Sequence, residues 1–306
     1  MPLFSITPTE LSTVDQTNFS AEKDLQTLIE KNLPVVFGCR FVSSEFPTGV
    51  QHSGRIDTLA LSEDNNPVIL EYKKVESSDL INQSLFYLSW IQDHRGDFEI
   101  AAQKELGAKV VVDWSDIRVI CLAPNYKRYD LHAVQVMGAN LELWTYRLFE
   151  NGALYLEEVF KKSVTTTAPS LGKELPAGQK AALSRKTGSY TVAQHFEGKP
   201  ANIQDLARSI QEFLLGLDPS MEEVPKKFYL AYKISQNIAC MEIQKQRVLL
   251  FVKLDPKKVA MTNKIARDVT RIGHYGTGDL ELSVRTSQDL DLAKPLLEQA
   301  YQKVGG

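Results

Sequence analysis

Apolar residues recur at helical spacing in two places in the first half of the chain. The first set is Leu25, Leu28, Ile29 and Leu33. Ser20, a residue type that caps helices, precedes them, so we expect a helix of about three turns that starts after Ser20. Residues 77–90 show the same spacing and predict a second helix.

Strand-like runs lie between and after these helices. Residues 55–61 and 68–73 flank the turn-forming segment 63–67, and together they predict a β-hairpin. Further strands are expected at residues 109–112, 117–122, 141–148 and 154–159, with a short helix at 129–137. The order αββαβ, with more strands after it, predicts a mixed α/β sheet with helices packed against it.

A change of composition separates the two halves of the chain. Residues 163–189 are rich in Thr, Pro, Gly and Lys, and we interpret them as a basic flexible linker. An amphipathic helix at 203–217, strands at 228–234, 238–243, 248–254 and 279–286, and a helix at 288–303 follow. We expect an α/β domain over residues 1–162 and a smaller α+β domain over 190–306 for targeting, DNA binding or assembly.

The net charge of −3 is unevenly distributed. Residues 1–160 carry 13 Lys and Arg against 23 Asp and Glu, a net charge of −10. Residues 161–189 carry 6 against 1, a net of +5, and residues 190–306 carry 16 against 14, a net of +2. The first segment repels a nucleic-acid backbone unless cations intervene, whereas the other two can attract one.

The composition argues against several protein classes. No apolar run approaches the ~18 residues of a membrane span, so a membrane-embedded carrier is not expected. The first residues resemble no signal peptide, and Cys39, Cys121 and Cys240 supply neither a disulfide framework nor a CxxC metal pair. We therefore expect a cytoplasmic protein, with homo-oligomerisation left open.

The predicted hairpin carries the most specific chemistry in the sequence. If Leu61 pairs with Pro67 across a five-residue loop, Asp57 lies directly opposite Glu71. Like charges paired across strands destabilise a sheet, so Lys73 and a hard cation, Mg²⁺ or Mn²⁺, are expected to compensate them. This combination suits phosphodiester hydrolysis. A solvated polar face is the alternative interpretation of the spacing alone.

The segments that carry these residues resemble the core of the PD-(D/E)XK nuclease superfamily, in particular the catalytic domain of NucS-type endonucleases. They read Gly-Arg-Ile-Asp at 54–57, Val-Ile-Leu-Glu-Tyr-Lys at 68–73 and Asn-Gln-Ser-Leu-Phe-Tyr-Leu at 82–88, within a likeness that covers about residues 20–150. The resemblance implies a restriction-endonuclease-like fold for the first domain. Tyr72 departs from the pattern, because a small aliphatic residue is usual at that position.

The resemblance also implies a role for each motif residue. Asp57 and Glu71 would bind the metal, Lys73 would assist the attacking water, and Gln83 would support the site. A glutamate on the first helix contributes in that family, which implies Glu22, with Glu30 as the alternative.

Two further groups of residues are candidates for contact with DNA. Gln83, Tyr87 and Trp90 share one flank of the second helix; Gln83 can bind a phosphate or a ligand water, and Tyr87 can line the substrate path, although packing is the preferred interpretation for Tyr87 and Trp90. Arg55, next to Asp57, can contact DNA or pair with an acidic neighbour.

Two features stand out in the second domain. Lys264, Arg267 and Arg271 would share one face if this segment is helical, which makes them a candidate phosphate-binding surface, with a solvated helix face as the alternative. The Gly-His-Tyr-Gly-Thr-Gly segment at 273–278 is interpreted as a turn, because it lacks the P-loop lysine and leads into a strand.

These features together predict a metal-dependent nuclease that hydrolyses DNA phosphodiester bonds. A non-catalytic module that retains the nuclease fold and binds nucleic acid or a protein remains the alternative.

Overall fold

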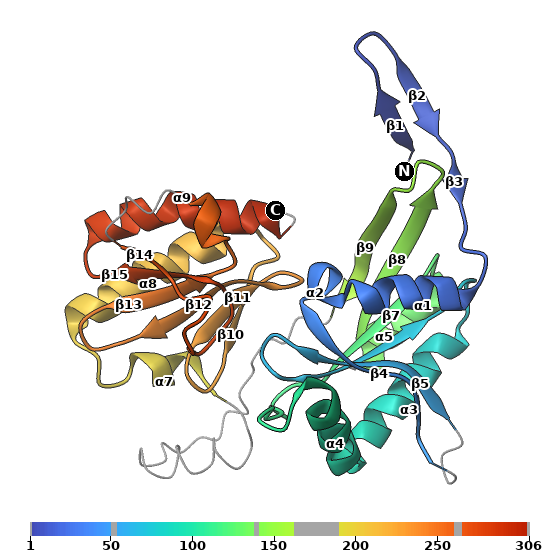
Figure 1. The fold of residues 1–306 in the computed structure, drawn as a ribbon, viewed down its shortest axis with the longest axis horizontal. Coiled ribbons are helices and arrows are strands. Elements are labelled where there is room, and N and C mark those ends of the chain that lie inside the picture. The colour runs from blue at the N-terminus through green and yellow to red at the C-terminus, as the bar shows by residue number, and fades with distance from the viewer. Residues whose placement is uncertain (1, 50–53, 138–140, 162–189, 260–264, 305–306) are drawn as a thin grey trace. The chain divides into compact units, whose positions relative to one another are not determined.

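The computed structural model describes residues 2–49, 54–137, 141–161, 190–259 and 265–304 (Figure 1). The chain divides into two compact units, residues 1–174 and 175–306. The linker expected at 163–189 lies outside the described residues. No helix in the described ranges is long and apolar enough to cross a membrane.

The first unit is built on one mixed sheet with helices on both faces (Figure 1). Its elements are β1 (Leu3–Ile6), β2 (Leu11–Val14), β3 (Gln16–Thr17), α1 (Glu22–Lys31), α2 (Leu33–Val36), β4 (Cys39–Pro47), β5 (Arg55–Ser62), β6 (Pro67–Tyr72), α3 (Asp79–Asp93), α4 (Arg95–Leu106), β7 (Arg118–Ala123), α5 (Arg128–Met137), β8 (Leu141–Phe149) and β9 (Leu154–Lys161). The sheet runs in the order β3-β8-β7-β6-β5-β4, and β9 pairs with β8. The predicted mixed α/β sheet is therefore confirmed.

The central strands are buried on both faces. β5 and β6 form the expected antiparallel hairpin with Leu61 opposite Pro67, whereas β6, β7 and β8 run parallel. Every residue of β6 and β7 is buried, which explains their nearly continuous apolar sequences. Helices α3, α4 and α5 cover one face through residues such as Leu80 and Phe98, and α1 covers the other through Leu25 and Ile29.

Two local predictions for this unit are wrong. The first helix begins at Glu22 with Ala21 as its cap rather than Ser20, because the Asp24 carboxylate accepts the Ala21 amide (2.8 Å). Residues 109–112 form a loop, not a strand. This loop lies along the core with Val110 and Val112 half-buried and Val111 77% exposed, and that arrangement reproduces the alternation of a strand.

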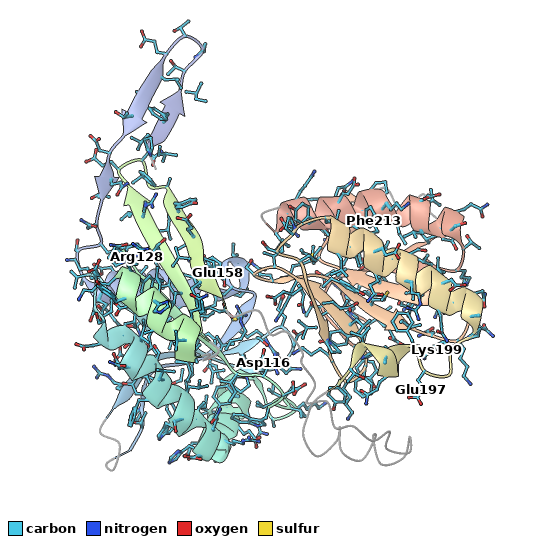
Figure 2. All side chains as sticks on the ribbon, turned by 180° about the vertical axis from the view of Figure 1, so that it is seen from behind. Asp116, Arg128, Glu158, Glu197, Lys199 and Phe213 are labelled. Atoms are coloured by element: carbon cyan, nitrogen blue, oxygen red, sulfur yellow. The ribbon has the colours of Figure 1, made fainter. Side chains whose placement is uncertain are left out.

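The sequence patterns also missed an edge strand, a helix and a hairpin. β4 contains polar residues and a register irregularity, and α4 buries only Phe98 and Ala102, so neither shows a strong period. The β1–β2 hairpin stands clear of the rest of its unit, with Phe4, Ile6 and Leu11 exposed (Figures 1 and 2). Because the hairpin is largely exposed to solvent, its sequence shows no regular alternation of apolar and polar residues that would have predicted it.

A buried ion pair links the starts of two parallel strands. Arg118 on β7 donates two hydrogen bonds to Glu142 on β8, at 2.7 and 2.9 Å, and both side chains are about nine-tenths buried. Removing two charged side chains from water costs free energy, which their mutual hydrogen bonds offset. The stability of the protein is therefore sensitive to the loss of either partner.

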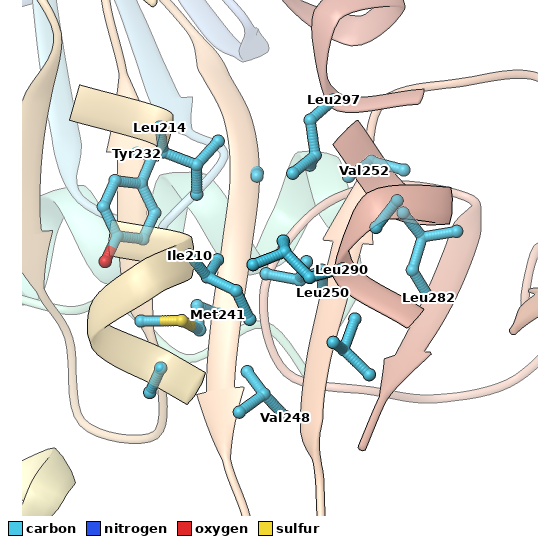
Figure 3. Packing of buried hydrophobic residues seen from close by; sticks show 14 of the residues in the cluster. Ile210, Leu214, Tyr232, Met241, Val248, Leu250, Val252, Leu282, Leu290 and Leu297 are labelled. Carbon is cyan, nitrogen blue, oxygen red and sulfur yellow. The ribbon is translucent and has the colours of Figure 1, made fainter. Parts of the chain in front are cut away.

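In residues 190–259 and 265–304, the second unit packs three helices on one face of an antiparallel sheet. Its elements are α7 (Val192–Phe196), α8 (Ala201–Gly216), β10 (Glu222–Pro225), β11 (Leu230–Lys233), β12 (Asn237–Ile243), β13 (Val248–Val252), the 3-10 turn η1 (Pro256–Lys258), β14 (Ala266–Asp268), β15 (Leu280–Val284) and α9 (Ser287–Lys303). The strand order is β10-β11-β12-β13-β15-β14. Ile210 and Leu214 of α8 and Leu290 and Leu297 of α9 pack on this sheet (Figure 3).

The helical face expected for the basic cluster is not present. Arg267 lies on strand β14, where it pairs with Glu281 (3.4 Å), and Arg271 follows in a turn. Lys264 lies outside the described residues. Val269 and Ile265 are buried, so strand pairing and burial decide this segment rather than the spacing of its cations.

The buried ion pair gives a stability prediction. Arg118→Met removes the two hydrogen bonds that the Arg118 guanidinium donates to the buried Glu142 carboxylate, so the free energy of unfolding should fall by about 3–5 kcal/mol. The double variant Arg118→Met/Glu142→Leu should recover most of this loss. Urea unfolding followed by tryptophan fluorescence measures it, because Trp90, Trp114 and Trp144 all lie in the first unit. A double variant as unstable as the single one would contradict this account.

Candidate active site

The predicted acid pair lies where strands β5 and β6 part. The backbone ladder between them ends at the pair Thr58–Leu70. Beyond it, carboxylates take over the hydrogen bonding: the Asp57 amide donates to Glu71 Oε1 and the Tyr72 amide donates to Asp57 Oδ2, each at 3.0 Å. Each acidic side chain therefore satisfies a backbone amide of the opposite strand.

Burial dominates the electrostatics of this pair. Glu71 is fully buried, and burial together with the charge of Asp57 raises the pKa of Glu71 to about 9. Burial also raises the pKa of Asp57, against the lowering effects of the Tyr72 amide and the Lys73 charge. Burial and the neighbouring Asp57 charge therefore favour the protonated form of Glu71.

Helix α1 brings a third carboxylate to the same place, next to two lysines that follow β6. Lys73 Nζ lies 3.4 Å from Glu22 Oε1, and the Lys74 amide donates to Glu22 Oε2 (2.9 Å). The Lys73 charge lowers the pKa of Asp57 and of Glu71. The structure thus brings together four predicted site residues, Glu22, Asp57, Glu71 and Lys73.

Glu30, the alternative to Glu22, takes part in a different contact. Its Oε1 accepts from Thr58 Oγ1 (2.7 Å) and from Gln26 Nε2 (3.0 Å). Gln26 is 3% exposed and also donates to the Asp57 carbonyl (2.7 Å). Sequence reasoning missed Gln26. Its signal was the i, i+4 spacing from Glu22, which places both on one side of α1.

Gln83 reaches the acid pair only through other residues. Its Nε2 donates to the Tyr87 hydroxyl (3.0 Å), which in turn donates to the Arg55 carbonyl (2.9 Å) and accepts the Arg55 amide (3.1 Å). Tyr87 is buried against Gly54, where a Cβ atom would lie 2.9 Å from the Tyr87 ring. These bonds fix the start of β5, two residues before Asp57.

The other residues considered for DNA contact are engaged elsewhere. Arg55 Nε lies 2.5 Å from Glu45 Oε2, and Glu45 also accepts from Lys23 Nζ (2.9 Å), so Arg55 pairs with an acidic neighbour. The Lys23 hydrogen bond is the main reason that the pKa of Glu45 is lowered. Trp90 is buried and donates to the Thr48 carbonyl (3.0 Å), as expected of a packing residue.

The free carboxylate oxygens of the pair fit a hard cation. Among the described residues, Glu71 Oε2 is buried and accepts no hydrogen bond, and none reaches Asp57 Oδ1. A buried polar atom without a partner costs about 1–3 kcal/mol. No group of three or more His, Cys, Asp or Glu side chains suited to a metal occurs in the described ranges. Two carboxylates still suit Mg²⁺, which commonly keeps water and substrate phosphates as its other ligands.

Comparisons with known proteins describe each half differently. The model of a family described as a domain of unknown function, DUF5655, matches residues 192–304. An uncharacterized protein of Haemophilus influenzae is 29% identical over 306 residues, covering 99% of this chain and all of that protein.

Solved endonuclease structures show a distant likeness to part of the chain. A complex of EndoMS with double-stranded DNA is 15% identical, with a TM-score of 0.30, over 47% of this chain and 64% of that one. A repair endonuclease from Pyrococcus abyssi is 20% identical, with a TM-score of 0.24, over 42% and 48% respectively. The chain thus spans less than two thirds of either structure.

The raised pKa of Glu71 predicts a pH-dependent loss of stability. The unfolded chain releases the Glu71 proton above about pH 4.5, whereas the folded protein keeps it up to about pH 9, so this group makes the protein less stable as pH rises between the two values. Glu71→Gln removes this effect. In EDTA, urea unfolding should show the variant gaining stability relative to wild type on going from pH 5 to pH 8.

Asp93→Asn, at the exposed end of α3, is the matched control and should follow the wild-type pH dependence. If Glu71→Gln changed the free energy of unfolding equally at both pH values, the Glu71 carboxyl would not have a raised pKa.

Proposed function

We propose that this protein is a metal-dependent nuclease that hydrolyses phosphodiester bonds of DNA. The observation that carries the proposal is the buried Asp57–Glu71 pair, in which Glu71 Oε2 has no hydrogen-bond partner among the described residues and Lys73 lies nearby. A protein that needed this corner of the sheet only for packing would be more stable with an apolar pair there. The resemblance of residues 54–57 and 68–73 to the PD-(D/E)XK motif supports the same interpretation.

Asp57 and Glu71 are the residues that would hold Mg²⁺ or Mn²⁺. The bound cation would polarise the phosphoryl oxygens and offset the charge that develops in the transition state. Each carboxylate already fixes its own orientation by accepting a backbone amide, so Asp57 Oδ1 and Glu71 Oε2 are left for this role. The site is thus preorganised, and little side-chain ordering is needed on binding.

Lys73 would act on the attacking water. Its ammonium has three donors, one of which is directed to Glu22 Oε1, so the others can hold a water next to a bound phosphate. Glu22 acts by positioning Lys73. Gln26 positions the Asp57 backbone, and the Gln83–Tyr87 contact positions the start of β5, so these residues support the site without touching the reacting atoms.

The proposal predicts cleavage of DNA only with Mg²⁺ or Mn²⁺. Asp57→Asn, Glu71→Gln and Lys73→Met should each lower kcat by at least about a hundredfold, because each removes a ligand or a group at the attacking water. Single-stranded, duplex and branched DNA are all assayed, with RNA as a comparison. Isothermal titration with Mn²⁺ provides a second readout, in which Asp57→Asn and Glu71→Gln lose binding while Lys73→Met retains it.

Asp93→Asn serves again as the control, because it removes an exposed carboxylate from the same unit. Cleavage that persists in Asp57→Asn with EDTA would overturn the proposal. Metal binding without cleavage of any nucleic acid would instead favour a non-catalytic module that retains the acid pair.

A further inference from the structure

The second unit carries a loop on the sheet face opposite its helices. That face is lined by a small buried cluster that includes Tyr229, Cys240 and Phe251, whereas the helices cover the other face. The loop, residues 269–279, connects β14 to β15 and includes the Gly-His-Tyr-Gly-Thr-Gly segment. It is a turn, as predicted, and its glycines show how it is held on the sheet.

Two glycines allow the loop to lie in close contact with the strands. A Cβ atom on Gly276 would lie 2.5 Å from the Cys240 Cβ, and one on Gly278 would lie 2.5 Å from the Val252 backbone. Both glycines have positive φ, +86° and +128°, which side-chain-bearing residues rarely adopt. Between them, the Thr277 amide donates to Cys240 Sγ (3.3 Å). The loop is therefore fixed in place, together with His274 and Tyr275, the two residues before Gly276.

Those two residues are aromatic and make ring stacks. His274 lies flat on Phe251, with 4.4 Å between centroids and 3° between planes. Tyr275 stacks on Phe228 at 4.0 Å and 25°. Phe251, under the His274 ring, is buried. The rings of the second stack are solvent-accessible: Phe228 is 42% exposed and Tyr275 is 53% exposed.

The exposed Phe228–Tyr275 stack, here called the aromatic shelf, has a lysine next to one of its rings. Lys227 Nζ is 5.0 Å from the Phe228 ring centroid, and Arg271 lies four residues before Tyr275 in the same loop. Arg267, on the same sheet face as Phe251, is 56% exposed, and the carboxylate it pairs with, Glu281, is almost buried. Residues 190–306 have a net charge of +2, whereas residues 1–160 have −10.

We propose that the aromatic shelf binds single-stranded nucleic acid, with a base stacked on the Tyr275 ring, which Phe228 supports from behind, and phosphates next to Lys227 and Arg271. Exposed aromatic rings that are held rigid offer stacking at little ordering cost, and every base has a face that can stack. Duplex DNA offers no unstacked bases, so it should not use the shelf. This inference uses residues separate from the acid pair, so it does not depend on the proposed function.

Fluorescence anisotropy with a labelled 20-nucleotide oligo(dT) and the full chain tests the proposal. EDTA is present throughout, so that binding is measured without cleavage. Tyr275→Ala and Phe228→Ala should each raise Kd by about fivefold or more, whereas Tyr275→Phe, which keeps the ring, should stay close to wild type. Lys227→Gln should reduce the slope of log affinity against log salt by about 0.7, the value for one phosphate contact on a single strand.

Three controls make the result specific. Tyr129→Ala removes a tyrosine that is 86% exposed on α5 and should not change Kd. A labelled duplex of the same length should bind Tyr275→Ala and wild type equally. Far-UV circular dichroism and thermal unfolding check that the Ala variants keep their fold, since residues 190–306 contain no tryptophan.

Equal oligo(dT) affinities for Tyr275→Ala and wild type would overturn the proposal, as would no measurable binding by wild type. Equal weakening of single-strand and duplex binding would also overturn it, because the contact would then not be base stacking. Asp57→Asn separates this inference from the nuclease proposal: it should lose cleavage and keep oligo(dT) binding, and a fully active Asp57→Asn would leave the shelf result standing.

Discussion

The candidate site depends on one constraint, which is that two carboxylates are buried together where a hairpin opens. Asp57 and Glu71 are tolerated there because each accepts a hydrogen bond from a backbone amide. Those amides would otherwise lack a partner, since the β5–β6 backbone pairing has already ended. The remaining cost appears in the raised pKa of both groups and in the unpartnered Glu71 Oε2. A site that is incompletely satisfied inside an otherwise well-packed sheet is more readily explained by a ligand than by packing.

The surrounding fold keeps this arrangement rigid. Strand β6 is paired on both sides, with β5 and β7, and each of its residues, Glu71 included, is buried. Helix α1 ties the end of β6 through Glu22 and the start of β5 through Gln26, and Tyr87 of α3 holds β5 from the other face. Helices on both sides of the sheet therefore position the same two carboxylates.

The sequence predicted the features that depend on local pattern and missed those that depend on tertiary contacts. The register that sets Asp57 against Glu71 follows from a short loop and strand alternation, and it is confirmed up to the last ladder pair. The face that Arg267 and Arg271 would share in a helix does not form, because pairing with β15 outweighs the spacing of charges. The contact of Gln26 with the Asp57 carbonyl joins residues 31 positions apart, and no single-sequence pattern reports such a contact.

The charge distribution suggests why one chain would combine these two units. A net charge of −10 over residues 1–160 opposes the approach of a polyanion, and a cation held by Asp57 and Glu71 offsets this only locally. Affinity for nucleic acid then has to come from surfaces that do not share this charge. Base stacking on Tyr275 would be insensitive to the negative charge of the first unit, and Lys227 would add a phosphate contact beside it. Separate residues can thus provide catalysis and substrate binding. Variants of Asp57 and Glu71 test the first, and variants of Phe228 and Tyr275 test the second.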